Sequence, residues 1–294
     1  MTARPPLDAL AIRRELRDVG LRARHGLSQN FLADVEVLEA IVDEADPAPG
    51  RRILEIGPGL GVLTGALLDA GAEVTAIELD RGLVARLRER HAAALEEGRL
   101  RLIEADALDL ELNAVVDAPF EVVANVPYHI TSPLLHAFLG SSPRPERLVL
   151  MVQREVAERI AAPPGGLSYL AVFVQYHAAV RIAFKVPPEA FEPEPAVESA
   201  VVVLEPRPDA ARLPDADVED ELWRLVQAGF RERRKMIHNV LSRQLPVDAA
   251  RVDDALAATG IAPDRRPQTL SVAEWRALRE ALGPIGADRR GRRS

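Results

Sequence analysis

The stretch LEIGPGLGVLT (residues 54–64) decides the fold class, because an apolar strand runs into three glycines and then into a helical pattern. A turn built from Gly57, Gly59 and Gly61 lets the backbone approach a ligand more closely than side chains would allow. Glu78 ends the next strand, 21 positions after Gly57. At that distance an acidic residue meets ribose hydroxyls in nucleotide-binding sheets. We therefore predict a nucleotide-type cofactor here, with simple packing of the turn as the alternative.

Strands and helices alternate from residue 51 to about residue 205. We expect strands at 52–56, 73–78, 100–104, 120–124 and 147–152, and helices at about 62–70, 82–95 and 130–139. Such alternation predicts an α/β fold, a Rossmann-like and mostly parallel sheet that is covered on both faces. Two later strands, 180–186 and 198–206, are joined by a proline-rich loop too short for a crossover helix, so we expect an antiparallel last strand.

The composition changes around residues 205–217, where proline, alanine and charged residues predominate. Four helical patterns follow, at 218–230, 231–245, 249–260 and 271–283, and the last opens with a capping box of Ser271 and Glu274. We therefore expect a basic N-terminal arm (1–28), an α/β domain (29–206), a linker (207–217), a small all-helical domain (218–284) and a disordered basic tail (285–294).

The bulk composition is that of an ordinary globular protein, with 48% hydrophobic and 28% charged residues among 294. There is no cysteine, and the six histidines lack metal-ligand spacing, so we expect neither disulfides nor a bound metal. No segment resembles a signal peptide or a membrane span, which predicts a cytoplasmic protein. The net charge is −8, but positive charge gathers before residue 28 and at residues 231–239, so a nucleic-acid partner stays possible.

The acidic residues around the glycine turn discriminate between cofactors. A dinucleotide fingerprint needs its third glycine at the position of Val62, and Glu55 would repel a pyrophosphate. Asp106 ends the third strand, where a carboxylate can accept a hydrogen bond from an adenine amine. A glycine turn, Glu78 and Asp106 at three consecutive strand ends fit S-adenosylmethionine better than NAD, because this cofactor has a ribose, an adenine and a cationic sulfonium but no phosphate.

The fourth strand ends in Asn125, Val126, Pro127 and Tyr128. An adenine amine is a poor nucleophile because its lone pair is conjugated into the ring. The Asn125 side chain and the Val126 or Pro127 carbonyl would hydrogen-bond its two N–H groups and free the lone pair to attack a methyl group. Tyr128 offers a face on which an extruded base can stack. Asparagine and proline also mark ordinary strand ends, which is the alternative interpretation.

These motifs, with SQNFLAD, AIELD, EADAL, NVPYHITSPLL, LMVQREVAERI, VPPEAFEPEPAVESAVV and FRERRKMIHNVL, resemble the KsgA (RsmA) family of ribosomal RNA small-subunit adenine N6,N6-dimethyltransferases over residues 20–280. The resemblance implies dimethylation of two adjacent adenosines in the 3′-terminal hairpin loop of 16S rRNA, during small-subunit assembly. It assigns S-adenosylmethionine contacts to Asn30, Leu32, Gly57, Glu78, Asp106 and Asn125, and Gly59 lies in the same turn. Phe191 matches the family's second aromatic residue at the target base.

Arg231, Arg234, Lys235 and His238 recur at helical spacing, and a one-sided cationic row of this kind suits RNA phosphates. A solvated helix face is the alternative.

We expect a monomer that acts on the small ribosomal subunit. Two other functions remain open: a 23S rRNA adenine N6-methyltransferase that confers antibiotic resistance, and a non-catalytic nucleic-acid-binding relative. A nicotinamide-dependent oxidoreductase is disfavoured by the glycine spacing.

Overall fold

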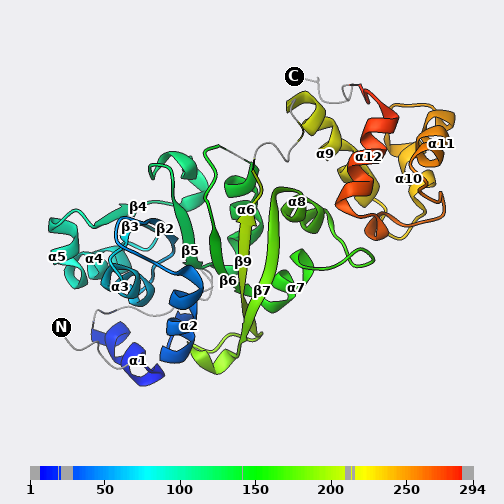
Figure 1. Ribbon diagram of the computed structural model, residues 1–294. Helices are drawn as coiled ribbons and strands as arrows, with labels where there is room; N and C mark the ends of the chain where they lie inside the picture. Colours follow the sequence, from blue (N-terminus) through cyan, green and yellow to red (C-terminus); the bar gives the residue numbers. More distant parts are fainter. Residues whose placement is uncertain are drawn as a thin grey trace, which may run out of the picture. The chain divides into compact units, whose positions relative to one another are not determined.

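The computed structural model describes residues 7–18, 20, 29–140, 142–208, 213 and 216–286, and its elements are shown in Figure 1. Part of the expected basic arm, most of the linker and the tail from residue 287 lie outside these residues. Contacts divide the chain into an α/β unit, Met1–Ala157 with Val180–Pro206, and a helical unit, Glu158–Ala179 with Arg207–Ser294. No helix of the described part is long and apolar enough to cross a bilayer.

A seven-stranded sheet forms the centre of the α/β unit, in the order β4-β3-β2-β5-β6-β9-β7. Its strands are β2 (Arg52–Ile56), β3 (Glu73–Glu78), β4 (Leu100–Glu104), β5 (Glu121–Asn125), β6 (Leu148–Gln153), β7 (Ala178–Val186) and β9 (Ser199–Pro206). The pairs among β2 to β6 are parallel, and β9 runs antiparallel to β6. The predicted mostly parallel sheet with an antiparallel last strand is confirmed.

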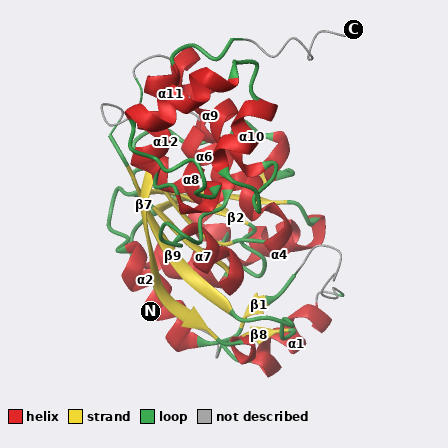
Figure 2. Ribbon diagram, turned by 90° about the vertical axis from the view of Figure 1, so that its right-hand side faces the viewer, coloured by secondary structure: helices red, strands yellow, loops and turns green. Residues whose placement is uncertain are grey.

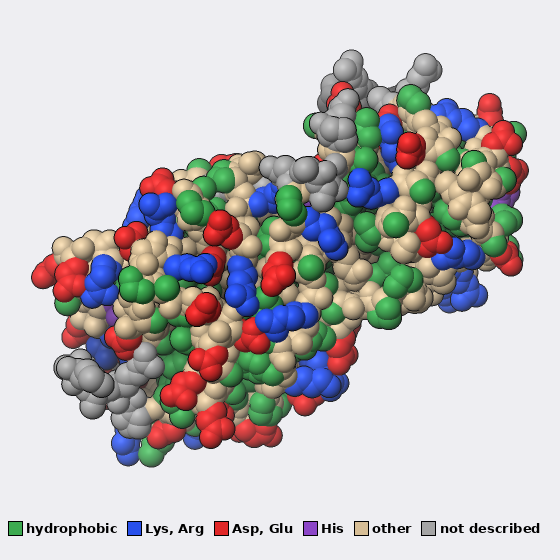
Figure 3. Space-filling model, in the orientation of Figure 1, with side chains coloured by type: hydrophobic (Ala, Val, Ile, Leu, Met, Phe, Trp, Pro, Cys, Tyr) green, Lys and Arg blue, Asp and Glu red, His purple; other side chains and the backbone are tan. Residues whose placement is uncertain are grey.

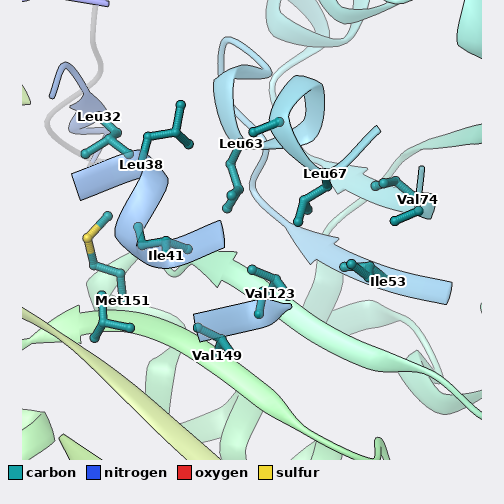
Figure 4. Packing of buried hydrophobic residues seen from close by; sticks show 14 of the residues in the cluster. Leu32, Leu38, Ile41, Ile53, Leu63, Leu67, Val74, Val123, Val149 and Met151 are labelled. Carbon is teal, nitrogen blue, oxygen red and sulfur yellow. The ribbon is translucent and has the colours of Figure 1, made fainter. Parts of the chain in front are cut away.

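Both faces of the sheet are buried, which explains why its strands are continuous apolar runs. Val122, Val123 and Ala124 of β5 are consecutive, and all three are at most 2% exposed. On one face, strand residues such as Val123 pack against Leu38 and Ile41 of α2 (Figure 4). Helices α2 (Val35–Ala45), α3 (Val62–Asp69), α4 (Arg81–Arg90), α5 (Ala92–Glu96) and α6 (Thr131–Gly140) belong to this unit, and α7 (Arg154–Ile160) begins in it and ends in the helical unit.

One predicted helix is interrupted. Residues 82–95 form two helices, α4 and α5, which His91 separates with non-helical backbone angles (φ −113°, ψ 28°). The His91 ring lies against the glycine turn, with Nε2 3.2 Å from the carbonyl oxygen of Gly61. The periodicity of the apolar residues does not reveal this break, because it comes from a contact with a distant segment.

The N-terminal segment adds a short second sheet and a helix to the α/β unit. β1 (Phe31–Leu32) pairs antiparallel with β8 (Phe191–Glu192), and α1 (Ala9–Asp18) lies beside β8 (Figure 2). Ile12 and Leu16 of α1 are buried. The expectation of a basic arm therefore needs correction for residues 9–18, which form a packed amphipathic helix.

The helical unit contains α8 (Tyr169–His177), α9 (Ala216–Phe230), α10 (Ile237–Gln244), α11 (Ala249–Ala258) and α12 (Val272–Leu282). Its core surrounds the fully buried Trp275, and the capping box at the start of α12 is confirmed. Leu167 and Tyr176 belong to the same core. Residues 158–179 therefore pack with the helical unit, whereas the sequence placed them in the α/β domain.

Candidate active site

A cavity of about 280 Å³ opens at the carboxyl ends of β2, β3 and β5. This is the edge at which doubly wound sheets bind ligands. Nearly all of the site residues predicted in the α/β unit line it: Asn30, Leu32, Gly57, Gly59, Glu78, Asp106, Asn125, Pro127 and Tyr128. The glycine turn, three carboxylates and the end of β5 thus surround one space.

The glycine turn is held in a conformation that suits few other residues. Gly57, Gly59 and Gly61 have φ angles of 67°, 60° and 77°, in the left-handed region that is costly for residues with a Cβ. The amide of Gly59 donates to Oε2 of Glu78 at 3.1 Å. An ideal Cβ on Gly61 would lie 2.5 Å from Cδ2 of Leu87. The third glycine is therefore required by the close approach of α4 as well as by its backbone angles.

Three carboxylates face the cavity, in different environments. Burial raises the pKa of Glu78, and hydrogen bonds from the amides of Asp80 and Gly59 oppose that rise. Glu55 is completely buried, which raises its pKa to about 8, although its carboxylate accepts a hydrogen bond from Oγ1 of Thr64 at 2.7 Å. Asp106 caps the short helix η2 (Ala107–Asp109). These oxygens provide acceptors for the hydroxyl and amine groups of a nucleoside.

The charge of the lining favours a cation over a phosphate. Among the described residues that line the cavity, none is Lys or Arg. A pyrophosphate would lack a cationic partner there and would lie close to carboxylates. A nucleoside that carries a positive charge and no phosphate fits this set of groups, in agreement with the expected S-adenosylmethionine. No three His, Asp or Glu side chains of the described segments gather in a way that could hold a metal ion.

The end of β5 forms the other wall. Asn125 donates from Nδ2 to the backbone oxygen of Asn30 at 3.2 Å, so its Oδ1 is left as the acceptor. The amide of Val126 bonds the carbonyl of Met151 at 3.0 Å and continues the pairing with β6. Tyr128 begins the short helix η4 (Tyr128–Ile130), and its hydroxyl lies 2.8 Å from Oγ of Ser199. The amide and the phenol ring are therefore both tethered.

Phe191 is not part of the lining. Its side chain is 1% exposed, and it belongs to the core beneath the pair that it forms with Leu32. The prediction that its ring stacks on the target base is not supported by this position. The ring is buried in the core of the α/β unit.

Two exposed apolar residues were missed by the sequence analysis. Leu79 is 51% exposed and Leu108 is 44% exposed, and both line the cavity. Leu79 directly follows Glu78, and Leu108 lies two positions after Asp106. An apolar residue beside a predicted ligand-binding acid, at a strand end, is the signal that would have found them. His129 of η4 also lines the cavity.

The basic segment of the helical unit differs from the prediction. Residues 231–236 form turns between α9 and α10 instead of continuing one helix, so the expected helical row does not exist. Arg231, Arg234 and Lys235 are exposed, whereas His238 lies on α10, with Nε2 3.1 Å from Oδ1 of Asp253. Arg231 bonds the side chain of Gln244.

Two cations of this turn have no carboxylate partner among the described residues. Within the described part of the chain, no carboxylate lies within ion-pair distance of Arg234 or Lys235. In the α/β unit, by contrast, Arg181 pairs with Glu44, and Figure 3 shows acidic and basic side chains intermixed on the face in view. Residues 231–235, here called the basic turn, therefore present four exposed cations suited to phosphate contacts, beside Glu232.

Comparison with known proteins gives consistent results. The family model described as ribosomal RNA adenine dimethylase matches residues 20–282. "Ribosomal RNA small subunit methyltransferase A" of Anaeromyxobacter sp. (strain K) is 42% identical over 276 residues, which cover 90% of this chain and 94% of that protein. The protein with the same name from Thermosynechococcus vestitus is 42% identical over 272 residues, or 89% of this chain and 97% of that one.

Two solved structures are similar along most of their length. A dimethyladenosine transferase from Plasmodium falciparum gives a TM-score of 0.72 at 28% identity, covering 84% of this chain and 95% of that chain. The 23S rRNA methyltransferase ErmE gives a TM-score of 0.69 at 29% identity, covering 86% of this chain and 99% of that chain.

Proposed function

The chain belongs to the ribosomal RNA adenine dimethylase family, and from this premise we propose that it dimethylates N6 of two adjacent adenosines in the 3′-terminal hairpin loop of 16S rRNA. It is an S-adenosylmethionine-dependent methyltransferase. The observation that supports the reaction most directly is the tethered Asn125 amide at the rim of a cavity that three carboxylates line. We propose that the protein acts as a monomer on the small ribosomal subunit, in the cytoplasm.

The proposed cofactor contacts follow the strand ends. Glu78 would accept hydrogen bonds from the ribose hydroxyls, Asp106 from the adenine amine, and the turn at Gly57 and Gly59 would lie against the cofactor. Asn30 and Leu32 would complete the site. Bound there, S-adenosylmethionine supplies an electrophilic methyl group, which needs no further activation by the protein.

Asn125 and a neighbouring carbonyl would hold the target amine. The Pro127 carbonyl already accepts from the amide of Ile130 at 3.1 Å, which favours the Val126 carbonyl as the second acceptor. Two acceptors on the two N–H groups pull the nitrogen toward a tetrahedral geometry and restore its lone pair. No general base is required, because the methylated amine is a strong acid and releases its proton to water. Tyr128 would stack on the extruded base.

The basic turn is proposed to contact RNA phosphates. Arg231, Arg234 and Lys235 are exposed, and exposed cations of this kind position a protein on RNA without reading its sequence. His238 remains a candidate for the edge of that contact. Its Nε2 contacts Asp253, and His238 would have to give up this contact to bind a phosphate.

A 23S rRNA methyltransferase is the second candidate, since ErmE has a similar structure. The higher identity of the relatives named for the small subunit, 42% against 29% for ErmE, favours the 16S substrate. The test is transfer of labelled methyl groups to small and large ribosomal subunits purified from cells that lack the enzyme, followed by mapping of the modified nucleotides. We expect label on two adjacent adenosines of the small subunit. Label on the large subunit alone would refute the proposal.

A further inference from the structure

The N-terminal helix α1 contacts the wall of the cofactor cavity from behind. Its buried residues Ile12 and Leu16 form one apolar cluster with Phe31, Leu60 and Leu83. Those last three residues all line the cavity. The helix therefore touches the outer surface of residues whose inner surface faces the cofactor.

A chain of polar contacts joins the same helix to the glycine turn. Glu15 of α1 accepts hydrogen bonds from Arg90 at 2.9 and 3.2 Å and from Arg86 at 3.0 Å. The same Nη1 of Arg90 donates to the backbone oxygen of Leu60 at 2.9 Å, between Gly59 and Gly61. Glu15, Arg86 and Arg90 are only 18–27% exposed, so these contacts are partly shielded from water and are stronger than surface ion pairs.

We propose that α1 belongs to the cofactor site. In this site Glu15 is a positioning residue: it orients Arg90, and Arg90 holds the glycine turn by its hydrogen bond to the carbonyl of Leu60. Two positions before Glu15, Arg13 attaches the same helix to β8 by donating to Glu192 at 2.7 Å. The positive charge before residue 28 left a nucleic-acid partner possible. Arg13 is instead engaged inside the α/β unit.

The physical reason lies in the backbone of the turn. Three left-handed glycines at alternate positions give the turn many alternative conformations when it is not held. The amide of Gly59 is held from one side by Glu78, and the carbonyl of Leu60 is held from the other side by Arg90. Without Glu15, the long Arg90 side chain regains rotamer freedom, and fixing it again upon cofactor binding costs affinity.

The test measures S-adenosylmethionine binding to the full chain by calorimetry, without RNA, well below the melting temperature. Glu15→Ala should weaken binding about threefold to tenfold, the size of about one net hydrogen bond. Arg90→Ala should weaken it more, and the double variant should be no worse than Arg90→Ala, because Glu15 acts through Arg90. Arg90→Lys should recover part of the loss. Arg14→Ala, an exposed charge on the same helix, is the matched control and should bind like wild type.

A second measurement separates positioning from a general loss of stability. Hydrogen exchange of a peptide over residues 57–64 should accelerate in Glu15→Ala, while peptides of β4 stay unchanged. Additive losses in the double variant, a Glu15→Ala effect no larger than that of Arg14→Ala, or unchanged exchange in the turn would overturn the inference. Should Arg90→Ala fail to fold, Glu15→Ala with hydrogen exchange decides alone.

The role of α1 rests on the proposed position of the cofactor. Experiments can nevertheless refute this role without refuting the proposed function, and can refute the function without refuting this role. A wild-type chain that binds S-adenosylmethionine and methylates no ribosomal particle would refute the function while Glu15→Ala still weakened binding. Methylation of the small subunit by a Glu15→Ala variant with wild-type cofactor affinity would refute only the role of α1.

Discussion

Gly61→Ala is expected to destabilise the protein for two separable reasons. Gly61 has φ 77°, where an alanine costs about 1–2 kcal/mol. The added Cβ would also lie 2.5 Å from Cδ2 of Leu87 and 2.7 Å from Nε2 of His91. Leu87 is 0% exposed and cannot move aside without disturbing the core, so overpacking adds about 1–3 kcal/mol. We expect a total loss of about 2–5 kcal/mol in the free energy of unfolding, measured by urea denaturation.

Gly98→Ala is the matched control. Gly98 has φ 72°, and nothing lies within 4 Å of its ideal Cβ, so it should show the backbone cost of about 1–2 kcal/mol without the packing cost. His91→Ala in the Gly61→Ala background should recover part of the loss by removing one of the two clashing side chains. Equal losses in Gly61→Ala and Gly98→Ala would refute the argument that the approach of α4 requires this glycine.

Three further predictions concern the site and the basic turn. Asn125→Ala should lower the single-turnover rate of methylation about 10²–10³-fold with little change in RNA affinity, and an unimpaired rate would contradict its role. Burial raises the pKa of Glu55 to about 8, so the folded chain keeps a proton that the unfolded chain releases near 4.5, and stability falls as the pH rises between these values. The free energy of unfolding of Glu55→Gln, relative to that of wild type, should therefore increase as the pH rises from 4.5 to 8. Denaturant titrations of the cofactor-free protein measure this difference, and a difference that does not change with pH would refute the assignment. Combined Arg234→Ala and Lys235→Ala substitutions should weaken binding to small subunits and reduce the slope of log affinity against log salt by roughly one to two, with cofactor affinity as the control that should not change.

The sheet was predictable because its signals are local. Each parallel strand is a short apolar run that ends at a glycine, an acid or an amide, and every predicted strand lies within two residues of the observed one. Parallel strands bring their carboxyl ends to one edge, so residues as distant as Gly57 and Asn125 were expected together. The cavity lining agrees with that expectation.

The turn between α9 and α10 was not predictable in this way. Residues 231–235 are four basic residues and one acidic residue, with good helix propensity and helical spacing. The helix is broken by contacts with a distant segment, since the amide of Ile237 bonds the carbonyl of Arg265 at 2.7 Å and that of His238 bonds Pro263 at 3.3 Å. Local helix propensity gives no information on such long-range hydrogen bonds, and here these bonds outweigh the propensity of residues 231–235 to form a helix.

The orientation of Asn125 shows the same limit at the centre of the site. The sequence identified the amide, but its direction depends on a hydrogen bond to the backbone oxygen of Asn30, 95 positions away. Every residue carries a backbone oxygen, so no sequence motif identifies the one that accepts from Nδ2 and thereby leaves Oδ1 as the acceptor for the target. It follows that Asn30→Ala should leave this bond in place, because the bond depends on the backbone at Asn30, next to the strand β1 that pairs with β8, and not on the side chain of Asn30.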